Sequence, residues 1–211
     1  MLKADKNDGV EASGFNYNKL SQPRDARKAL INLLQNAHAG EKAAANAYYG
    51  HAFSLFVRDK KEQEEIFQIY KDELHHRSRL FEMLTDLKAK PRFFRELGMY
   101  LIGGVICVLS YFGTWFIPMY GAGKLERSNV GEYEVAARLA FLAGEKAIID
   151  ELLLFAEVEW DHELYFKEKV QSHFLSKWIS LWPEIHKREF IRSSFEEFRK
   201  SGTSFNVPFD R

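Results

Sequence analysis

The sequence has a single cysteine, Cys107, and its 30 basic and 30 acidic residues cancel. One cysteine excludes an internal disulfide and any metal site built from cysteines alone, and it favours a reducing, cytoplasmic compartment. Zero formal charge gives no overall attraction to nucleic acid, so we expect no such partner. The opening stretch, MLKADKNDGVEASGF, lacks an apolar run, which predicts no secretory signal and a disordered polar leader over residues 1–23.

Strand-like alternation of useful length is also missing, whereas helical periodicity dominates from Asp25 onward. The 211 residues, 46% of them apolar, suffice for one core, and the fold class predicted is all-α. We expect a four-helix bundle over residues 24–172. Its first helix runs to about Val57 and its second to about Lys88, and Gly144 separates the third from the fourth.

Residues 97–123 contain no charge, which is unusual for a chain with this many charged residues. The run is long enough to cross a bilayer, but Gly103, Gly104, Gly113 and Pro118 interrupt it. A transmembrane helix, a membrane-lodged hairpin and a buried core helix are all compatible with it. We favour insertion at a membrane surface, and a homodimer interface is the other use for so large an apolar surface.

The tail, residues 173–211, alternates aromatic and basic residues and predicts an amphipathic helix after Pro183. Aromatic and basic side chains of this kind suit the headgroup region of a membrane. The residues concerned are Lys177, Trp178, Trp182, Lys187 and Arg188.

Glu41 lies on the stripe of the first helix that should be buried, together with Leu34, Tyr48 and Leu55. Burying an ionised carboxylate costs several kcal/mol unless a cation, a metal or a hydrogen-bond donor compensates it. The position of Glu41 therefore indicates a metal ligand or a partner to a buried base.

Two Glu-x-x-His pairs occupy apolar helix faces in the same way: Glu73 with His76, and Glu159 with His162. Residues three apart project from adjacent turns of one face, so a carboxylate and an imidazole can converge on one ion. Two such pairs and a lone inward glutamate match the ligand inventory of a di-iron carboxylate bundle. His75 and His38 lie nearby, and His75 replaces His76 if the second helix is rotated.

The third helix should add one more glutamate, and three positions qualify: Glu132, Glu134 and Glu145. A hairpin at Gly144 brings Glu134 nearly level with Glu159, whereas Glu145 lies about 21 Å along the axis from it. Glu134 is our prediction, although Arg138 one turn later also allows a plain salt bridge there.

Three motifs resemble those of the demethoxyubiquinone hydroxylases: AHAGEKAAANAYYGH in the first helix, DELHHRSRLFEML in the second and EVEWDHELYF in the fourth. The similarity covers about residues 30–170, and the tail beyond His173 is an addition. The resemblance implies a ferritin-like fold with two iron ions as cofactor. Carried over to this chain, the ligands would be Glu41, Glu73, His76, Glu134, Glu159 and His162.

The function implied is that of an O₂-dependent monooxygenase, which hydroxylates a lipophilic quinone-type ring at a membrane surface. No flavin or nicotinamide motif occurs, so electrons must come from the substrate or from an external donor. Tyr48 and Tyr49 are candidates for the pocket lining. The alternatives are an iron-binding or peroxide-handling protein of ferritin-like or rubrerythrin-like type, and a hydroxylase of a modified tRNA base.

Overall fold

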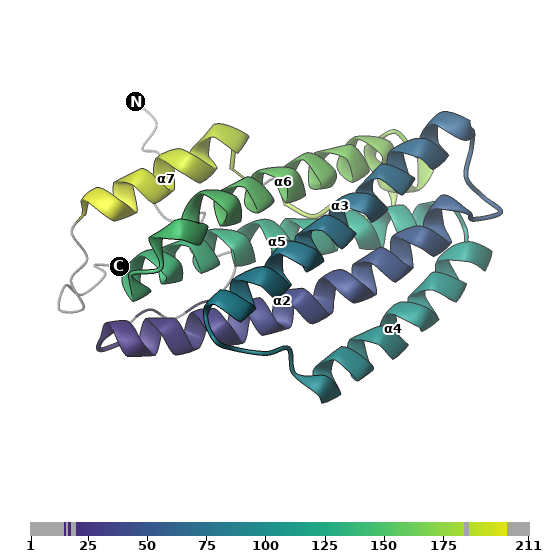
Figure 1. Ribbon diagram of the computed structural model, residues 1–211. Coiled ribbons are helices and arrows are strands. Elements are labelled where there is room, and N and C mark those ends of the chain that lie inside the picture. The colour runs from purple at the N-terminus through teal and green to yellow at the C-terminus, as the bar shows by residue number, and fades with distance from the viewer. Residues whose placement is uncertain (1–14, 16, 18–19, 184–185, 202–211) are drawn as a thin grey trace, which may run out of the picture. The chain divides into compact units, whose positions relative to one another are not determined.

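A computed structural model of the chain describes residues 15, 17, 20–183 and 186–201. Within these residues it contains six α-helices and no strand, which confirms the predicted all-α class (Figure 1). The helices are α2 (Pro23–Ala52), α3 (Lys60–Asp86), α4 (Phe93–Phe112), α5 (Phe116–Ala143), α6 (Ile149–Gln171) and α7 (Arg188–Lys200). Two short 3₁₀ helices, η2 (Lys146–Ile148) and η3 (Phe174–Lys177), flank α6.

Local sequence signals explain where the helices begin and end. The side chain of Asp59 accepts a hydrogen bond from the backbone N–H of Glu62 and caps the start of α3. Gly144, with φ of 80°, adopts the left-handed conformation that ends α5. The α7 helix follows Pro183 as expected. Most of the predicted leader lies outside the described residues, but Tyr17 within it is buried.

The charge-free run does not form one element. It is divided between α4 and the first turns of α5, with a break at residues 113–115. A Cβ atom at Gly113 would lie 2.5 Å from the carbonyl oxygen of Leu109, so glycine permits the chain to turn away here. Pro118 lies in the first turn of α5, where its missing N–H costs nothing.

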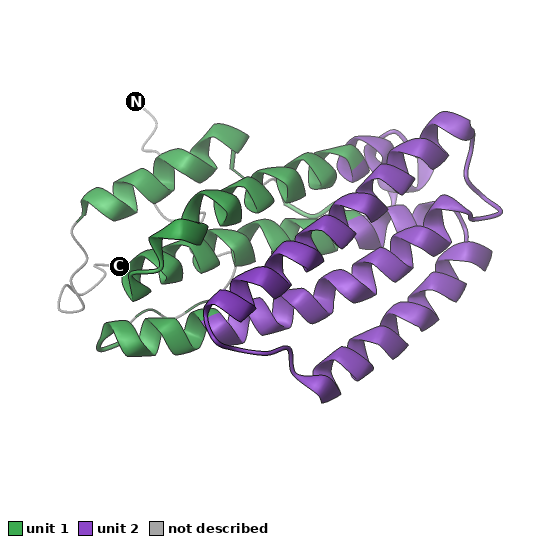
Figure 2. Ribbon diagram, viewed as in Figure 1, with its two compact units in different colours: residues 1–30, 123–165, 180–211 green, residues 31–122, 166–179 purple. Residues whose placement is uncertain are grey.

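The described residues divide into two compact units, coloured separately in Figure 2. Unit 2 comprises residues 31–122 and 166–179, and its α2 and α4 pack backbone against backbone. A Cβ atom at Gly50 would lie 2.1 Å from the carbonyl oxygen of Cys107, and one at Gly103 would lie 2.6 Å from the Cα atom of Ala43. The backbone N–H of Leu55 also donates to the carbonyl of Tyr111 at 3.2 Å. These contacts fix α4 along α2.

Unit 1 comprises residues 1–30, 123–165 and 180–211. Its core contains the edge-to-face pair of Tyr133 on α5 and Phe155 on α6. The apolar face of α7 is also buried, and Phe195 and Phe198 both pack edge to face on Phe141. The tail helix is therefore amphipathic, as predicted, and its apolar face is covered by protein.

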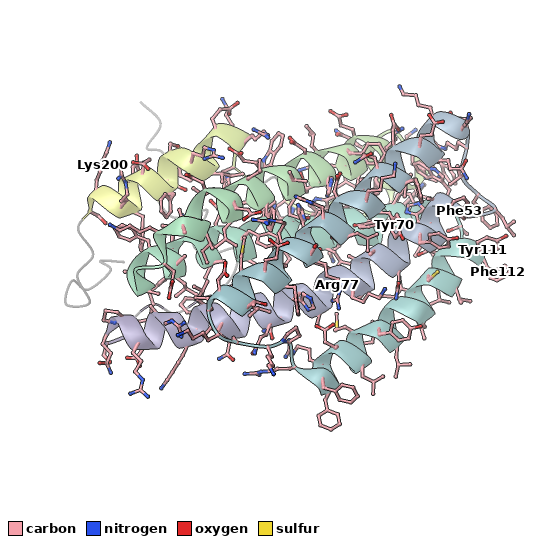
Figure 3. The ribbon with its side chains drawn as sticks, in the orientation of Figure 1. Phe53, Tyr70, Arg77, Tyr111, Phe112 and Lys200 are labelled. Carbon is pink, nitrogen blue, oxygen red and sulfur yellow. The ribbon has the colours of Figure 1, made fainter. Side chains whose placement is uncertain are left out.

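The α4 helix is long and apolar enough to cross a membrane, by length and composition alone, and 11% of its most apolar stretch is buried. Large apolar side chains are exposed along this helix, among them Phe94, Leu101, Val105 and Leu109. At its end lie Phe112 and, from the loop after α2, Phe53, both labelled in Figure 3. A soluble core helix would bury these side chains, so the exposed apolar surface of α4 requires another explanation.

We expect Gly103→Ala and Gly104→Ala to shift stability in opposite directions. The Cβ atom added at Gly103 meets the backbone of Ala43, and overpacking of this kind costs about 1–3 kcal/mol. Nothing lies within 4 Å of the Cβ position of Gly104, where alanine should stabilise the helix by about 0.5–1 kcal/mol. Urea unfolding of both variants measures the difference. Equal stabilisation by both would contradict the close packing of α2 and α4.

Candidate metal centre

In unit 2, α2 and α3 bring three buried ligand side chains together. Glu41 is contributed by α2, and Glu73 and His76 by successive turns of α3. Each offers one ligand atom, and these atoms lie within 4.8 Å of one another. We call these three residues cluster A. Buried apolar residues on the same faces, such as Leu34 and Leu80, explain why the helices turn these polar groups inward.

In unit 1, α5 and α6 form a second group of the same composition. Glu126 on α5 and Glu159 with His162 on α6 are buried, and their ligand atoms lie within 4.8 Å of one another. We call them cluster B. The side-chain amide of Asn129 donates to Glu126 at 3.0 Å and to Glu159 at 3.4 Å, and so spans the two carboxylates.

Each cluster offers two carboxylates and one imidazole, and such groups can hold a metal ion. Oxygen and nitrogen donors without thiolate suit iron, manganese and zinc. Carboxylates gathered in the interior repel one another, and a bound cation offsets that repulsion. The donor sets therefore fit a divalent or trivalent transition metal.

Five of the six predicted ligands lie in these clusters. Glu41, Glu73 and His76 meet in cluster A, and Glu159 and His162 meet in cluster B. His75 is exposed on α3 and takes no part in cluster A. The α3 helix therefore turns His76, rather than His75, toward the cluster, as predicted.

Glu134 is placed in a different buried group. Its carboxylate lies 3.1 Å from Nε2 of His186 and 3.5 Å from Oγ of Ser194, and Nη2 of Arg138 is 4.0 Å away. Burial alone lowers the pKa of His186, but the hydrogen bond and charge of Glu134 raise this pKa above its ordinary value. Of the other candidates, Glu145 pairs with Arg27 at 2.9 Å.

Glu126 was not among the predicted ligands, although the sequence contains a signal for it. It lies on the α5 stripe of Met119, Ala122, Val130 and Tyr133, all buried and all uncharged. A single acid on such a stripe is the same signal that identified Glu41. The third helix was expected to follow the charge-free run, which ends at Gly123, so Glu126 fell in its first turn. An acid is common there because it interacts favourably with the helix dipole.

Comparison of the chain with protein-family models, with curated proteins and with solved structures yields no match. The candidate site therefore rests on its own residues and geometry.

A charged hydrogen-bond group joins α4 to the ligand-bearing helices of unit 2. Glu96, the acid in the first turn of α4, accepts from Arg77 at 2.6 Å and lies 2.7 Å from Nδ1 of His38. Arg77, labelled in Figure 3, also donates to the carbonyl of His38. Burial raises the pKa of Glu96, but these hydrogen bonds outweigh burial and lower it below its ordinary value. The group attaches α4 to α2 at His38, one turn before Glu41, and to α3 at Arg77, the residue after His76.

The two tyrosines proposed for the pocket differ in environment. Tyr48 is buried and stacks on Phe166, with ring centroids 5.7 Å apart. Tyr49 is half exposed and contacts Phe53 and Tyr70. Of the two, only Tyr48 is buried, so it is the better candidate for the lining of a buried pocket.

His51, also stacked on Phe166, should make stability depend on pH. Burial lowers the pKa of His51 from 6.5 to about 4, and its Nε2 atom has no hydrogen-bond partner among the described residues. The native state therefore binds fewer protons than the unfolded chain between these values, and stability falls as pH falls. The loss should reach about 2 kcal/mol at about pH 5.

Urea unfolding of wild type and His51→Gln at about pH 7 and about pH 5 measures this effect, because glutamine does not titrate in that range. The variant should lose less stability on acidification than wild type. Equal losses in the two proteins would show that His51 does not contribute.

Proposed function

We propose that the chain is a di-iron, O₂-dependent monooxygenase of the ferritin-like type, in which α2, α3, α5 and α6 form a four-helix bundle. The observation that carries this proposal is the pair of buried clusters with identical donor sets, two carboxylates and one histidine each. Bundles that present a Glu from each of two helices and a Glu-x-x-His pair from each of the other two hold two iron ions in this way.

The six proposed ligands are Glu41, Glu73, His76, Glu126, Glu159 and His162. Glu126 replaces Glu134 in this set because it accompanies Glu159 and His162 in cluster B. Iron bound by these groups supplies the capacity to activate O₂. The protein holds the ligands in place and keeps water away: all six are buried, and Asn129 orients the two carboxylates of cluster B.

The proposed substrate is a lipophilic ring of the quinone type, taken from a membrane surface. The apolar, mostly exposed α4 supports this choice, because a bilayer would cover its side chains. Glu96 ties this helix to α2 and α3, which bear cluster A. Electrons would be supplied by the reduced substrate or by an external donor.

Anaerobic loading with ferrous ion, followed by O₂ and a quinone-type substrate in lipid vesicles, tests the proposal. We expect product that contains one added oxygen atom, with the label of isotopic O₂, and recovery of the chain with floating vesicles. Ferric ion that accumulates without substrate oxidation would instead support iron storage or peroxide handling. A chain that stays wholly in the soluble fraction would contradict the role given to α4.

A further inference from the structure

The tail beyond His173 makes a set of polar contacts that the proposed reaction does not use. They all lie in unit 1 and involve Trp182, Pro183, His186, Arg188, Arg192 and Ser194. We call these residues the strap. Figure 1 shows α7, which carries three of them, alongside α6.

The strap holds α6 through residues that alternate with the proposed ligands. Arg192 donates two hydrogen bonds to Glu157, at 2.7 and 3.1 Å. Arg188 donates two to Asp161, at 2.9 and 3.1 Å. Glu157 lies two residues before Glu159 and Asp161 two residues after it. At 3.6 residues per turn, both project from the side of α6 nearly opposite to Glu159.

Two indole groups complete the attachment to α6. The indole N–H of Trp182 donates to Glu163 at 2.5 Å, and both residues are buried. The indole N–H of Trp160 donates to the backbone carbonyl of His186 at 2.8 Å. Glu163 directly follows His162. The segment of α6 that carries Glu159 and His162 is therefore hydrogen-bonded to the strap both before and after these ligands.

The same segment also holds α5, the helix that carries Glu126. His186 and Ser194 contact Glu134, and Nη2 of Arg138 lies 3.2 Å from Oγ of Ser194. Arg127, the residue after Glu126, donates to the backbone carbonyl of Pro183. The buried Glu134 thus anchors the strap.

We propose that the strap positions cluster B, because it bridges α5 and α6 and so keeps Glu126, Glu159 and His162 within reach of one ion. The residues of the strap are positioning residues that act through Glu157, Asp161 and Glu163. This inference rests on the metal centre proposed above, but it does not depend on the reaction that the centre performs. Removal of a group that orients a metal ligand typically lowers metal affinity about 10-fold to 100-fold.

The test is titration of the metal-free chain with Co²⁺, whose visible absorption reports ligand geometry. We expect Arg188→Gln/Arg192→Gln to weaken binding at cluster B by about 10-fold or more and to change the spectrum. Arg188→Lys/Arg192→Lys should retain more affinity than the glutamine variant, because lysine keeps the positive charge but cannot form the bidentate hydrogen bonds of arginine. Arg199→Gln is the matched control, since Arg199 pairs with Glu196 within α7.

Trp182→Phe provides a second variant, which keeps an aromatic but smaller side chain and removes the indole N–H that donates to Glu163. It should shift the Co²⁺ spectrum even where the melting temperature changes little. Unchanged affinity and spectrum in both strap variants, with or without lower stability, would overturn the positioning role and leave the metal centre intact. Absence of Co²⁺ binding by the wild type would overturn the centre itself and the strap's role with it.

Discussion

Glu41→Gln should abolish O₂-dependent chemistry while it leaves the helical content unchanged. Glutamine has the shape of glutamate, but a neutral amide does not balance the charge of a metal ion and binds it poorly. In the wild type, ferrous ion at about 100 times its dissociation constant should add about 2.7 kcal/mol to the free energy of unfolding. In the variant, this stabilisation should be much smaller, and circular dichroism melting with and without iron measures both.

The metal-free variant should be as stable as the metal-free wild type, or more stable, because one carboxylate fewer is buried in cluster A. Glu82→Gln is a suitable control, since Glu82 is exposed on α3 and pairs with Arg79. If Glu41→Gln kept the full iron-induced stabilisation, Glu41 would be a buried acid with a structural role only.

Glu126→Gln and Glu134→Gln should have different effects on metal stoichiometry, although both residues are buried acids on α5. Glu126 belongs to cluster B, so its substitution should remove one bound metal ion per chain and all hydroxylation activity. Glu134 anchors the strap, and glutamine can still hydrogen-bond to His186 and Ser194. This variant should retain two metal ions per chain, with affinity lowered by no more than about 10-fold.

Isothermal titration of both metal-free variants under anaerobic conditions gives the stoichiometries. The reverse result, with one ion lost in Glu134→Gln and none in Glu126→Gln, would return Glu134 to the ligand set. It would also remove the basis for regarding Glu134 as an anchor of the strap.

The sequence was sufficient for the helices and for most of the candidate ligands because both follow from local periodicity. A charged residue on an apolar stripe, as at Glu41 or Glu73, can be recognised without any knowledge of distant contacts. Glu126 carried the same signal, but it was concealed because the third helix was expected to follow the charge-free run, which ends at Gly123. The α5 helix begins at Phe116, and Glu126 therefore lies in its third turn rather than its first.

The environment of Glu134 could not be predicted in the same way. It depends on His186 and Ser194, which are 52 and 60 residues distant in the chain. Trp182 is a similar case, because its aromatic side chain suggested a membrane headgroup region, whereas it is buried and hydrogen-bonded to Glu163. Long-range polar pairs leave no periodic signature, so the role of the tail emerges only from the folded chain.

The measurement that tests the central claim most directly is a Mössbauer spectrum of the chain loaded with isotopically enriched iron and oxidised by O₂. A di-iron centre built from clusters A and B predicts about two iron ions per chain in a magnetically coupled pair with a diamagnetic ground state. Magnetically isolated ferric ions, or a fully folded chain that takes up no iron, would contradict it.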